Sequence, residues 1–323
     1  MGSRDLRLDG LKFFLVCLVV ISHCIQSFRY DDIVVGWTVH IIHSFHMPLF
    51  VILSGYFYKL CDWNKELRKS LRLIETFVVV TLVFWLTDGM KYSWPLVRLG
   101  ICPSWYLFSL VCWRLLSNVL LRHVSDTRLL VYSIVVSVLA YILLNKGEGL
   151  FSIMRSIQFY PYFLLGYTMK TGSVSLNRVP KTPVYIVSGI ITTVIAMLVS
   201  YPLFAQECQS TGLFRWCDTF NKSIVAGGGY YLLVKIASLA NSFTIWKGIK
   251  VPDSICTYGQ STLAVYAFNT MTFPLIYHYC THLWMSICAA ILTIVISLFL
   301  NRIGLAKYLI NPITSIIITN KTI

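Results

Sequence analysis

The sequence predicts an all-α integral membrane protein with about ten transmembrane helices and both termini in the cytoplasm. Of its 323 residues, 57% are hydrophobic and only 12% are charged, about half the charged fraction of a typical soluble domain. Apolar stretches of about 20 residues, long enough to cross a bilayer, recur along almost the whole chain. Lys and Arg residues gather in alternate loops between these stretches, as they do in polytopic membrane proteins.

The apolar stretches, separated by charged and turn-forming residues, give ten expected spans. The spans cover approximately residues 11–28, 37–58, 72–90, 105–121, 128–145, 153–170, 183–203, 223–241, 258–276 and 283–303. The positive-inside rule places the cation-rich loops, together with both termini, in the cytoplasm. Termini on the same side require an even number of spans, which agrees with ten.

No repeat, linker or long polar stretch divides the chain, so we expect a single polytopic domain over residues 1–323. The first apolar stretch contains Lys12 and His23 and no small-residue cleavage site follows it, so it is expected to remain as a membrane helix. The net charge of +14 resides mostly in short loops, which favours membrane lipids over nucleic acid as a partner. Cys208 and Cys217 share one expected outer loop and could pair in an oxidising compartment.

Two polar residues stand out in the first span. Lys12 and His23 are eleven residues apart, which places them on one face of a helix, within about 20° and about 16 Å apart along the axis. Asp9 lies one turn before Lys12 and is close enough to pair with it. One interpretation is a path along which coenzyme A leaves its phosphates among cytoplasmic cations and delivers its thioester to His23. In the other, Lys12 reaches the lipid headgroups and His23 bonds a neighbouring helix, and geometry alone leaves both open.

The second span carries a stripe of histidines. His40, His43 and His46 step three residues at a time and therefore lie on one side of the helix. They could line a polar cavity or form a three-histidine zinc site. No carboxylate that would orient such ligands is apparent, so no metal is expected. Pro48 and Gly55 indicate that this helix bends.

Cations before and within later spans are candidate anion-binding groups. Four of them, spaced to form one stripe on a helix, are Lys65, Arg68, Lys69 and Arg72. The stripe could hold phosphates or meet anionic headgroups. Arg114 lies within the fourth span, where an unpaired guanidinium is costly, so it needs a partner or a bound anion. Ser54, Asp88 and Asn269 are further polar residues in or near spans, and each alone is a weak signal.

Five motifs, in a fixed order, indicate a family. The first is a basic residue, Lys12, and a histidine, His23, with ten residues between them. The others are Phe45-His46-Met-Pro-Leu-Phe-Val-Ile-Leu-Ser54-Gly55-Tyr-Phe57, Ser104-Trp105-Tyr106-Leu107, Phe163-Leu-Leu-Gly166-Tyr167 and Gly259-Gln-Ser261-Thr-Leu-Ala-Val-Tyr266. Together they resemble the membrane acyltransferase-3 family, and the second is especially similar to members resembling fucose 4-O-acetylases.

The resemblance implies an integral membrane enzyme that transfers acyl groups, usually acetyl, to extracytoplasmic carbohydrates. It makes His23 the catalytic histidine and Lys12 the essential basic residue of the first helix. The family's paired arginines before the third helix fall on Lys69 and Arg72. Lysine at the first position keeps the charge but loses the planar guanidinium fork. The late histidine of the family is absent, with Asn269 nearby, and no catalytic role is assigned to that position.

We therefore expect an O-acetyltransferase of the bacterial plasma membrane and cell envelope. It would move acetyl from cytoplasmic acetyl-CoA to a hydroxyl of a surface polysaccharide or a lipid-linked saccharide, with His23 as general base. Four cations are expected to hold the coenzyme A phosphates, namely Lys12, Lys69, Arg72 and Arg114. Five residues are expected to line the substrate path, namely His43, His46, Ser54, Trp105 and Tyr106.

Two other classes remain open from the sequence. In a transporter or channel, the intramembrane histidines would line a proton or solute path. The inverted repeats typical of many transporters are not evident in the sequence. A flippase-like lipid carrier would need no chemistry at these residues at all.

Overall fold

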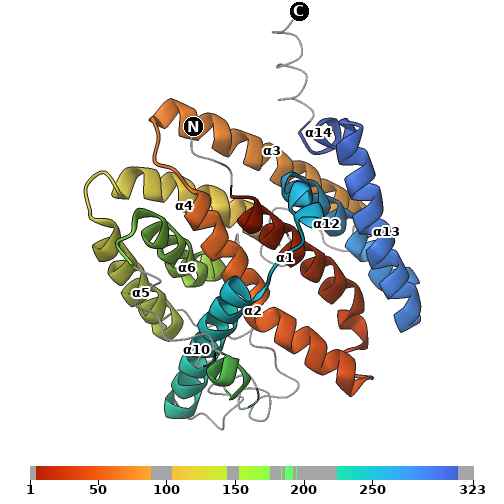
Figure 1. Ribbon diagram of the computed structural model, residues 1–323, viewed down its shortest axis with the longest axis horizontal. Helices are drawn as coiled ribbons and strands as arrows, with labels where there is room; N and C mark the ends of the chain where they lie inside the picture. The colour runs from red at the N-terminus through yellow and green to blue at the C-terminus, as the bar shows by residue number, and fades with distance from the viewer. Residues whose placement is uncertain are drawn as a thin grey trace, which may run out of the picture. The chain divides into compact units, whose positions relative to one another are not determined.

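The computed structural model describes residues 5–88, 104–143, 153–174, 183, 186–191, 194 and 224–311. Within these ranges the secondary structure is helical and no strand occurs (Figure 1). The helices are α1 (Leu6–Ile25), η1 (Gln26–Phe28), α2 (Ile33–Phe57), α3 (Trp63–Thr87), α4 (Trp105–Leu120), α5 (Asp126–Leu143), α6 (Ile153–Thr171), α10 (Ile224–Gly248), α11 (Asp253–Cys256), η4 (Thr257–Ser261), α12 (Thr262–Tyr279), α13 (Leu283–Arg302) and α14 (Leu305–Ile310). The all-α expectation is confirmed for this part of the chain.

Nine of the ten expected spans fall on one of these helices. The largest difference is at α3, which begins at Trp63 rather than near residue 72, because the cation-rich segment continues the helix. The ninth span begins as the 3₁₀ turn η4 and becomes α-helical at Thr262. Most of the expected seventh span, 183–203, lies outside the described residues. The Cys208–Cys217 pair lies entirely outside them. The total of ten spans and the cytoplasmic termini therefore stay predictions.

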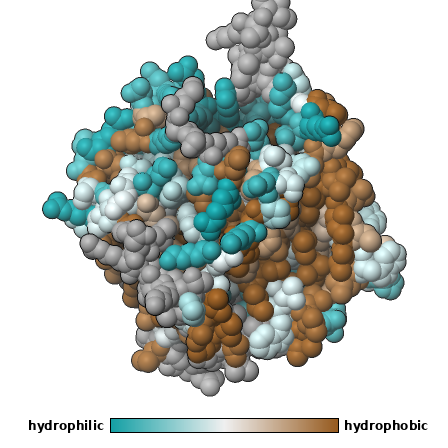
Figure 2. Space-filling model, viewed as in Figure 1, coloured by the Kyte–Doolittle hydropathy of each residue, from teal (hydrophilic) through white to brown (hydrophobic). Residues whose placement is uncertain are grey.

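Four of the described helices are long and apolar enough to cross a membrane: α1 with η1, α2, α3 and α13. Figure 2 shows a hydrophobic surface over α13, at the right of the view. Its large exposed side chains are Trp284, Ile287, Ile291, Leu292, Val295, Ile296 and Phe299. A helix whose outer face is apolar along its length suits contact with lipid, and the chain is a multi-pass membrane protein.

The described residues pack into two compact units. The first comprises the described residues within Met1–Gly36, Asn64–Val111 and Lys250–Ile323, and the second those within Trp37–Trp63 and Cys112–Ile249. This division concerns packing alone, so the single polytopic domain stays a prediction.

In the first unit, α1 packs against α12, α13 and η4 (Figure 1). A small apolar core joins α3, α12 and α14 through Val80, Ala267, Met271 and Ile310. Two hydrogen bonds support this packing, from Thr76 Oγ1 to Asn311 Oδ1 at 2.8 Å and from Thr87 Oγ1 to the Met271 carbonyl at 3.2 Å.

In the second unit, α2 and α6 approach closely enough that their backbones touch. A Cβ atom at Gly55 would overlap the Phe163 carbonyl, and one at Gly166 would overlap the Ile52 carbonyl. Both glycines belong to the motifs that the sequence singled out. Small residues at helix crossings are a general feature of membrane proteins, because they let two backbones come together.

Candidate functional site

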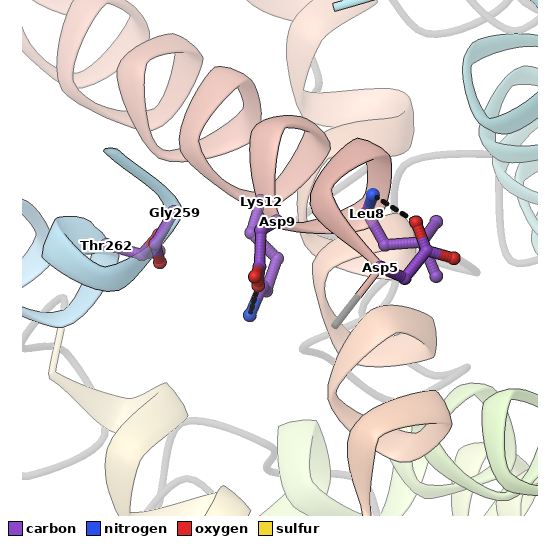
Figure 3. Close-up of polar contacts among 6 residues, drawn as sticks. All are labelled: Asp5, Leu8, Asp9, Lys12, Gly259 and Thr262. Carbon is purple, nitrogen blue, oxygen red and sulfur yellow. Dashed lines mark hydrogen bonds and ion pairs between the residues drawn. The ribbon is translucent and has the colours of Figure 1, made fainter. Parts of the chain in front are cut away.

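The first turns of α1 hold an ion pair. Asp5 caps the helix, accepting a hydrogen bond from the Leu8 amide at 3.2 Å. One turn later, Lys12 Nζ lies 2.7 Å from Asp9 Oδ1 (Figure 3). The Asp9 side chain is only 4% exposed and that of Lys12 is 24% exposed. The expected pairing is confirmed, and the buried carboxylate fixes the position of the lysine ammonium.

A segment from the other end of the chain packs on this turn. A Cβ atom at Gly259 would lie 2.5 Å from Asp9 Cβ and 2.6 Å from the Asp9 carbonyl oxygen, so only glycine fits there. The Gly259 carbonyl accepts a hydrogen bond from Thr262 Oγ1 at 2.8 Å, which ties η4 to the start of α12. Figure 3 shows Gly259 and Thr262 beside the turn that carries Asp9 and Lys12. Gly259, from the last of the five motifs, therefore contacts Asp9, the ion-pair partner of Lys12.

His23 lies on the same helix, near its other end. Because α1 is one continuous helix from Leu6 to Ile25, the expected separation of about 16 Å from Lys12 applies. The half-buried His23 ring meets Phe273 of α12 edge-on, with 5.6 Å between ring centroids and 70° between planes. Sequence analysis did not single out Phe273, since an aromatic residue in an apolar span carries no signal of its own.

Trp105 and Tyr106 begin α4, and both side chains are buried. The Tyr106 ring meets Tyr266 of α12 at 5.8 Å and 70°. Tyr266 and Phe273 are seven residues apart and thus lie on one face of α12, within about 20°. That face therefore contacts α4 at Tyr106 and, about two turns further on, α1 at His23.

Asn269 lies between Tyr266 and Phe273 and is 1% exposed. Neither its Nδ2 nor its Oδ1 atom has a hydrogen-bond partner among the described residues. Most buried amides in proteins are paired, because leaving one unpaired costs about 1–3 kcal/mol.

The cations of α3 do not lie on the buried face of that helix. Glu66, Ser70 and Thr76 are buried, whereas Arg72 is exposed and Lys69 is half-buried. These two residues belong to the first unit, as do Lys12, His23, Trp105 and Tyr106. The remaining expected site residues, Arg114, His43, His46 and Ser54, belong to the second unit.

Arg114 has an aromatic neighbour in the second unit. Its guanidinium carbon lies 5.4 Å from the centroid of the Tyr58 ring, a cation–π distance. Tyr58 in turn donates from its hydroxyl to the Arg114 carbonyl at 3.3 Å. The partner that the sequence analysis required for Arg114 is thus at least in part the Tyr58 ring. The role of Arg114 in binding coenzyme A stays a prediction.

Two of the expected site residues of α2, His46 and Ser54, bond to carbonyls of their own helix. His43 and His46 are ring neighbours at 4.9 Å, and His46 Nδ1 donates to the Ile42 carbonyl at 2.8 Å. Ser54 Oγ donates to the Phe50 carbonyl at 2.8 Å. In the described part of the chain, no group of three or more His, Cys, Asp or Glu could hold a metal ion. The three-histidine zinc interpretation gains no support, and the substrate-path role of these residues stays a prediction.

Lys235 of α10 is a half-buried cation that sequence analysis did not select. Its Nζ atom donates to the Gln158 carbonyl at 3.1 Å and lies 5.0 Å from the Tyr162 ring and 5.3 Å from the Tyr231 ring. Its position as an ionisable residue inside an apolar span could have identified it from the sequence. Its neighbours give it a structural explanation, since rings and a carbonyl stabilise the ammonium.

Comparisons with known proteins give one family match over most of the chain and one short match to a relative. The model of the acyltransferase domain family matches residues 5–302. The nodulation protein NolL of Mesorhizobium japonicum is 30% identical over 89 residues, which are 27% of this chain. The match spans about a quarter (24%) of that relative's length. No solved structure matches the chain.

Proposed function

The chain belongs to the acyltransferase domain family, whose model matches residues 5–302, and from this premise we propose that it is a membrane O-acetyltransferase. It takes acetyl from acetyl-CoA on the cytoplasmic side of the cell membrane. The acceptor is a hydroxyl of an extracytoplasmic glycan or of a lipid-linked saccharide in a bacterial envelope. Acyl transfer by a membrane protein follows from the family and the apolar helices, whereas donor, direction and acceptor are the proposal.

The observation that carries the proposal is the arrangement of α1. One continuous apolar helix holds a cation fixed by Asp9 near its start and a half-buried imidazole near its end. Their separation of about 16 Å is similar to the reach of an extended pantetheine arm. A donor anchored by its phosphates at Lys12 would thus bring its thioester to His23, on the far side of the apolar layer.

The cations of the first unit supply the phosphate-binding charge. Lys12 contributes a positioned ammonium, and the exposed Arg72 and half-buried Lys69 extend the positive surface along α3. Charge-assisted hydrogen bonds to phosphate are about twice as strong as neutral ones. Arg114 is a secondary candidate because Tyr58 already faces its guanidinium.

In the proposed reaction, His23 takes the proton of the acceptor hydroxyl as that oxygen attacks the thioester carbonyl carbon. A C–O bond forms and the carbonyl electrons move onto oxygen. The tetrahedral intermediate then collapses, the C–S bond breaks, and the coenzyme A thiolate receives the proton from His23. Transfer through an acetyl-imidazole at His23 is the covalent variant of the same chemistry.

Trp105 and Tyr106 are proposed to face the acceptor. Aromatic rings offer a flat apolar surface with a polar edge, which suits the C–H face of a sugar. Tyr106 contacts Tyr266, on the α12 face that also carries Phe273 beside His23, so the face links the two proposed substrate positions.

The test is acetyl transfer by the purified protein from labelled acetyl-CoA to a panel of glycans and lipid-linked saccharides. Wild type is expected to label one acceptor and His23→Ala to label none, while both bind acetyl-CoA. The modified hydroxyl is then assigned by NMR. The proposal fails if folded wild type neither binds acetyl-CoA nor transfers label, and solute movement in proteoliposomes would then favour a transporter.

A further inference from the structure

The amide of Asn269 calls for an explanation that the fold does not provide. The side chain is 1% exposed, yet both of its polar atoms lack hydrogen-bond partners among the described residues. A buried amide without partners is unfavourable, so it persists in proteins mainly where a ligand or water completes it.

Its position on α12 indicates what that ligand is. Asn269 follows Tyr266 by three residues and precedes Phe273 by four, which places it within about 60° of both around the helix axis. Tyr266 contacts Tyr106, and Phe273 contacts His23. The carboxamide therefore lies, along the helix, between the aromatic group proposed for the acceptor and the proposed general base.

The neighbouring positions of α12 are occupied by the fold itself. Ala267 and Met271 belong to the apolar core with Val80 and Ile310. Thr270 is fully buried, and its hydroxyl donates to the Tyr266 carbonyl at 3.1 Å. Asn269 is thus set apart from adjacent residues whose contacts are complete.

We propose that Asn269 Nδ2 donates a hydrogen bond to the carbonyl oxygen of the acetyl group during transfer. The proposal rests on the function proposed above. As the acceptor oxygen attacks and His23 takes its proton, negative charge develops on the carbonyl oxygen, and the neutral amide N–H stabilises it. When the C–S bond breaks, the carbonyl re-forms and the hydrogen bond weakens. A donor aimed at developing charge in a water-poor site is among the largest contributions that a protein makes to acyl transfer.

The test compares Asn269→Ala and Asn269→Asp with Thr270→Val, a matched control at the adjacent buried position. We expect the two Asn269 variants to lower kcat by about 100- to 1000-fold, the usual effect of losing one such donor. KM for acetyl-CoA and for the acceptor should stay within about threefold, because the interaction forms only in the transition state. Thr270→Val should keep kcat within about threefold, since it removes one backbone-bonded hydroxyl.

Thermal unfolding separates this role from a structural one. Asn269→Leu replaces an amide without described partners by an apolar side chain of similar size, so its midpoint should equal or exceed that of wild type. A protein that is as stable as wild type but transfers acetyl about 100-fold more slowly would support the proposal. A lower midpoint that tracks the loss of transfer would contradict it.

The remaining outcomes are also decisive. If wild type and Asn269→Ala transfer equally fast, Asn269 has no role and the proposed function stands. If Asn269→Ala raises only the acceptor KM, the amide binds the acceptor hydroxyl and the oxyanion role is wrong. If folded wild type does not transfer acetyl at all, the proposed function fails and this inference fails with it.

Discussion

Helices α2 and α12 both bury polar side chains in apolar surroundings, but the hydrogen bonding of those side chains differs between them. In α2, His46 and Ser54 donate to carbonyls of their own helix, at Ile42 and Phe50. Ser44 does the same at Ile41 and also accepts a hydrogen bond from Asn241 Nδ2 at 2.9 Å. In α12, Asn269 is equally buried and has no such partner among the described residues.

The difference distinguishes buried polar groups that bond to their own helix from one, Asn269, whose amide has no hydrogen-bond partner among the described residues. A hydrogen bond to a carbonyl of the preceding turn satisfies a buried hydroxyl, or one nitrogen of an imidazole, without any ligand. An amide left unsatisfied keeps its hydrogen-bonding capacity for something outside the fold. Burial and residue type alone, which the sequence can indicate, do not make this distinction.

The largest expected effect contrasts the two helices through their histidines. His23→Ala should lower kcat by about 100- to 10,000-fold, because it removes the proposed general base. His46→Ala, the matched change in α2, removes no proposed base, so it should keep kcat within about threefold and lower stability by about 1–3 kcal/mol. Steady-state kinetics and thermal unfolding of both variants measure this. A large rise in acceptor KM for His46→Ala would instead support the substrate-path role predicted from the sequence.

The next effect concerns the contact between Gly259 and Asp9, the ion-pair partner of Lys12. Gly259→Ala would place a Cβ atom against the Asp9 backbone, so α1 and η4 must separate, at an expected cost of about 1–3 kcal/mol of stability. Gly10→Ala is the milder comparison, because its Cβ would meet the side chains of Cys256 and Val251 rather than backbone. Equal unfolding midpoints for Gly259→Ala and wild type would show that this close contact does not contribute to stability.

A smaller effect is expected from the cations. Lys12→Ala should weaken acetyl-CoA binding about tenfold, as expected for one partly exposed charged hydrogen bond. Lys235→Met should leave that binding within about threefold but lower stability, because rings and the Gln158 carbonyl surround the ammonium. Isothermal titration with acetyl-CoA compares the two. Unchanged binding in Lys12→Ala would remove Lys12 from the phosphate site.

The smallest effect belongs to a carboxylate whose hydrogen bonds are complete. Burial alone would raise the pKa of Asp126, but hydrogen bonds from Ser173, Thr171 and Thr127 outweigh it and hold the pKa below its ordinary value of 3.8. A depressed pKa adds stability above the unfolded-state value, and this stability is lost as the pH falls through the folded-state value. Asp126→Asn should therefore cost under about 1 kcal/mol at pH 7, and the difference from wild type should shrink below about pH 4. A difference that stays constant with pH would show that the charge is not involved.

The sequence predicted the helices better than the site. Apolar runs located nine helices to within a few residues in most cases, and helical spacing predicted both the Lys12–Asp9 pair and the shared face of Lys12 and His23. The apolar run gave too late a start for α3, but the helical spacing of the cations from Lys65 to Arg72 correctly predicted that this segment is helical. The correct predictions therefore rested mostly on periodicity within single helices.

The contacts between helices could not be obtained in this way. Phe273 beside His23, Tyr266 beside Tyr106 and Tyr58 beside Arg114 depend on which helix faces pack together, and spacing within one helix does not determine that. The sequence showed Asn269 as a polar residue in a span. That its amide has no hydrogen-bond partner among the described residues can be seen only when the neighbouring side chains are known.

The most direct test of the account is the sidedness of transfer across α1. Oriented proteoliposomes would receive labelled acetyl-CoA on one side and a membrane-impermeant acceptor on the same or the opposite side. Label should reach the acceptor only from the opposite side, with the donor on the Lys12 side, and His23→Ala should abolish it. Equal transfer with donor and acceptor on the same side would contradict a path that runs from Lys12 to His23.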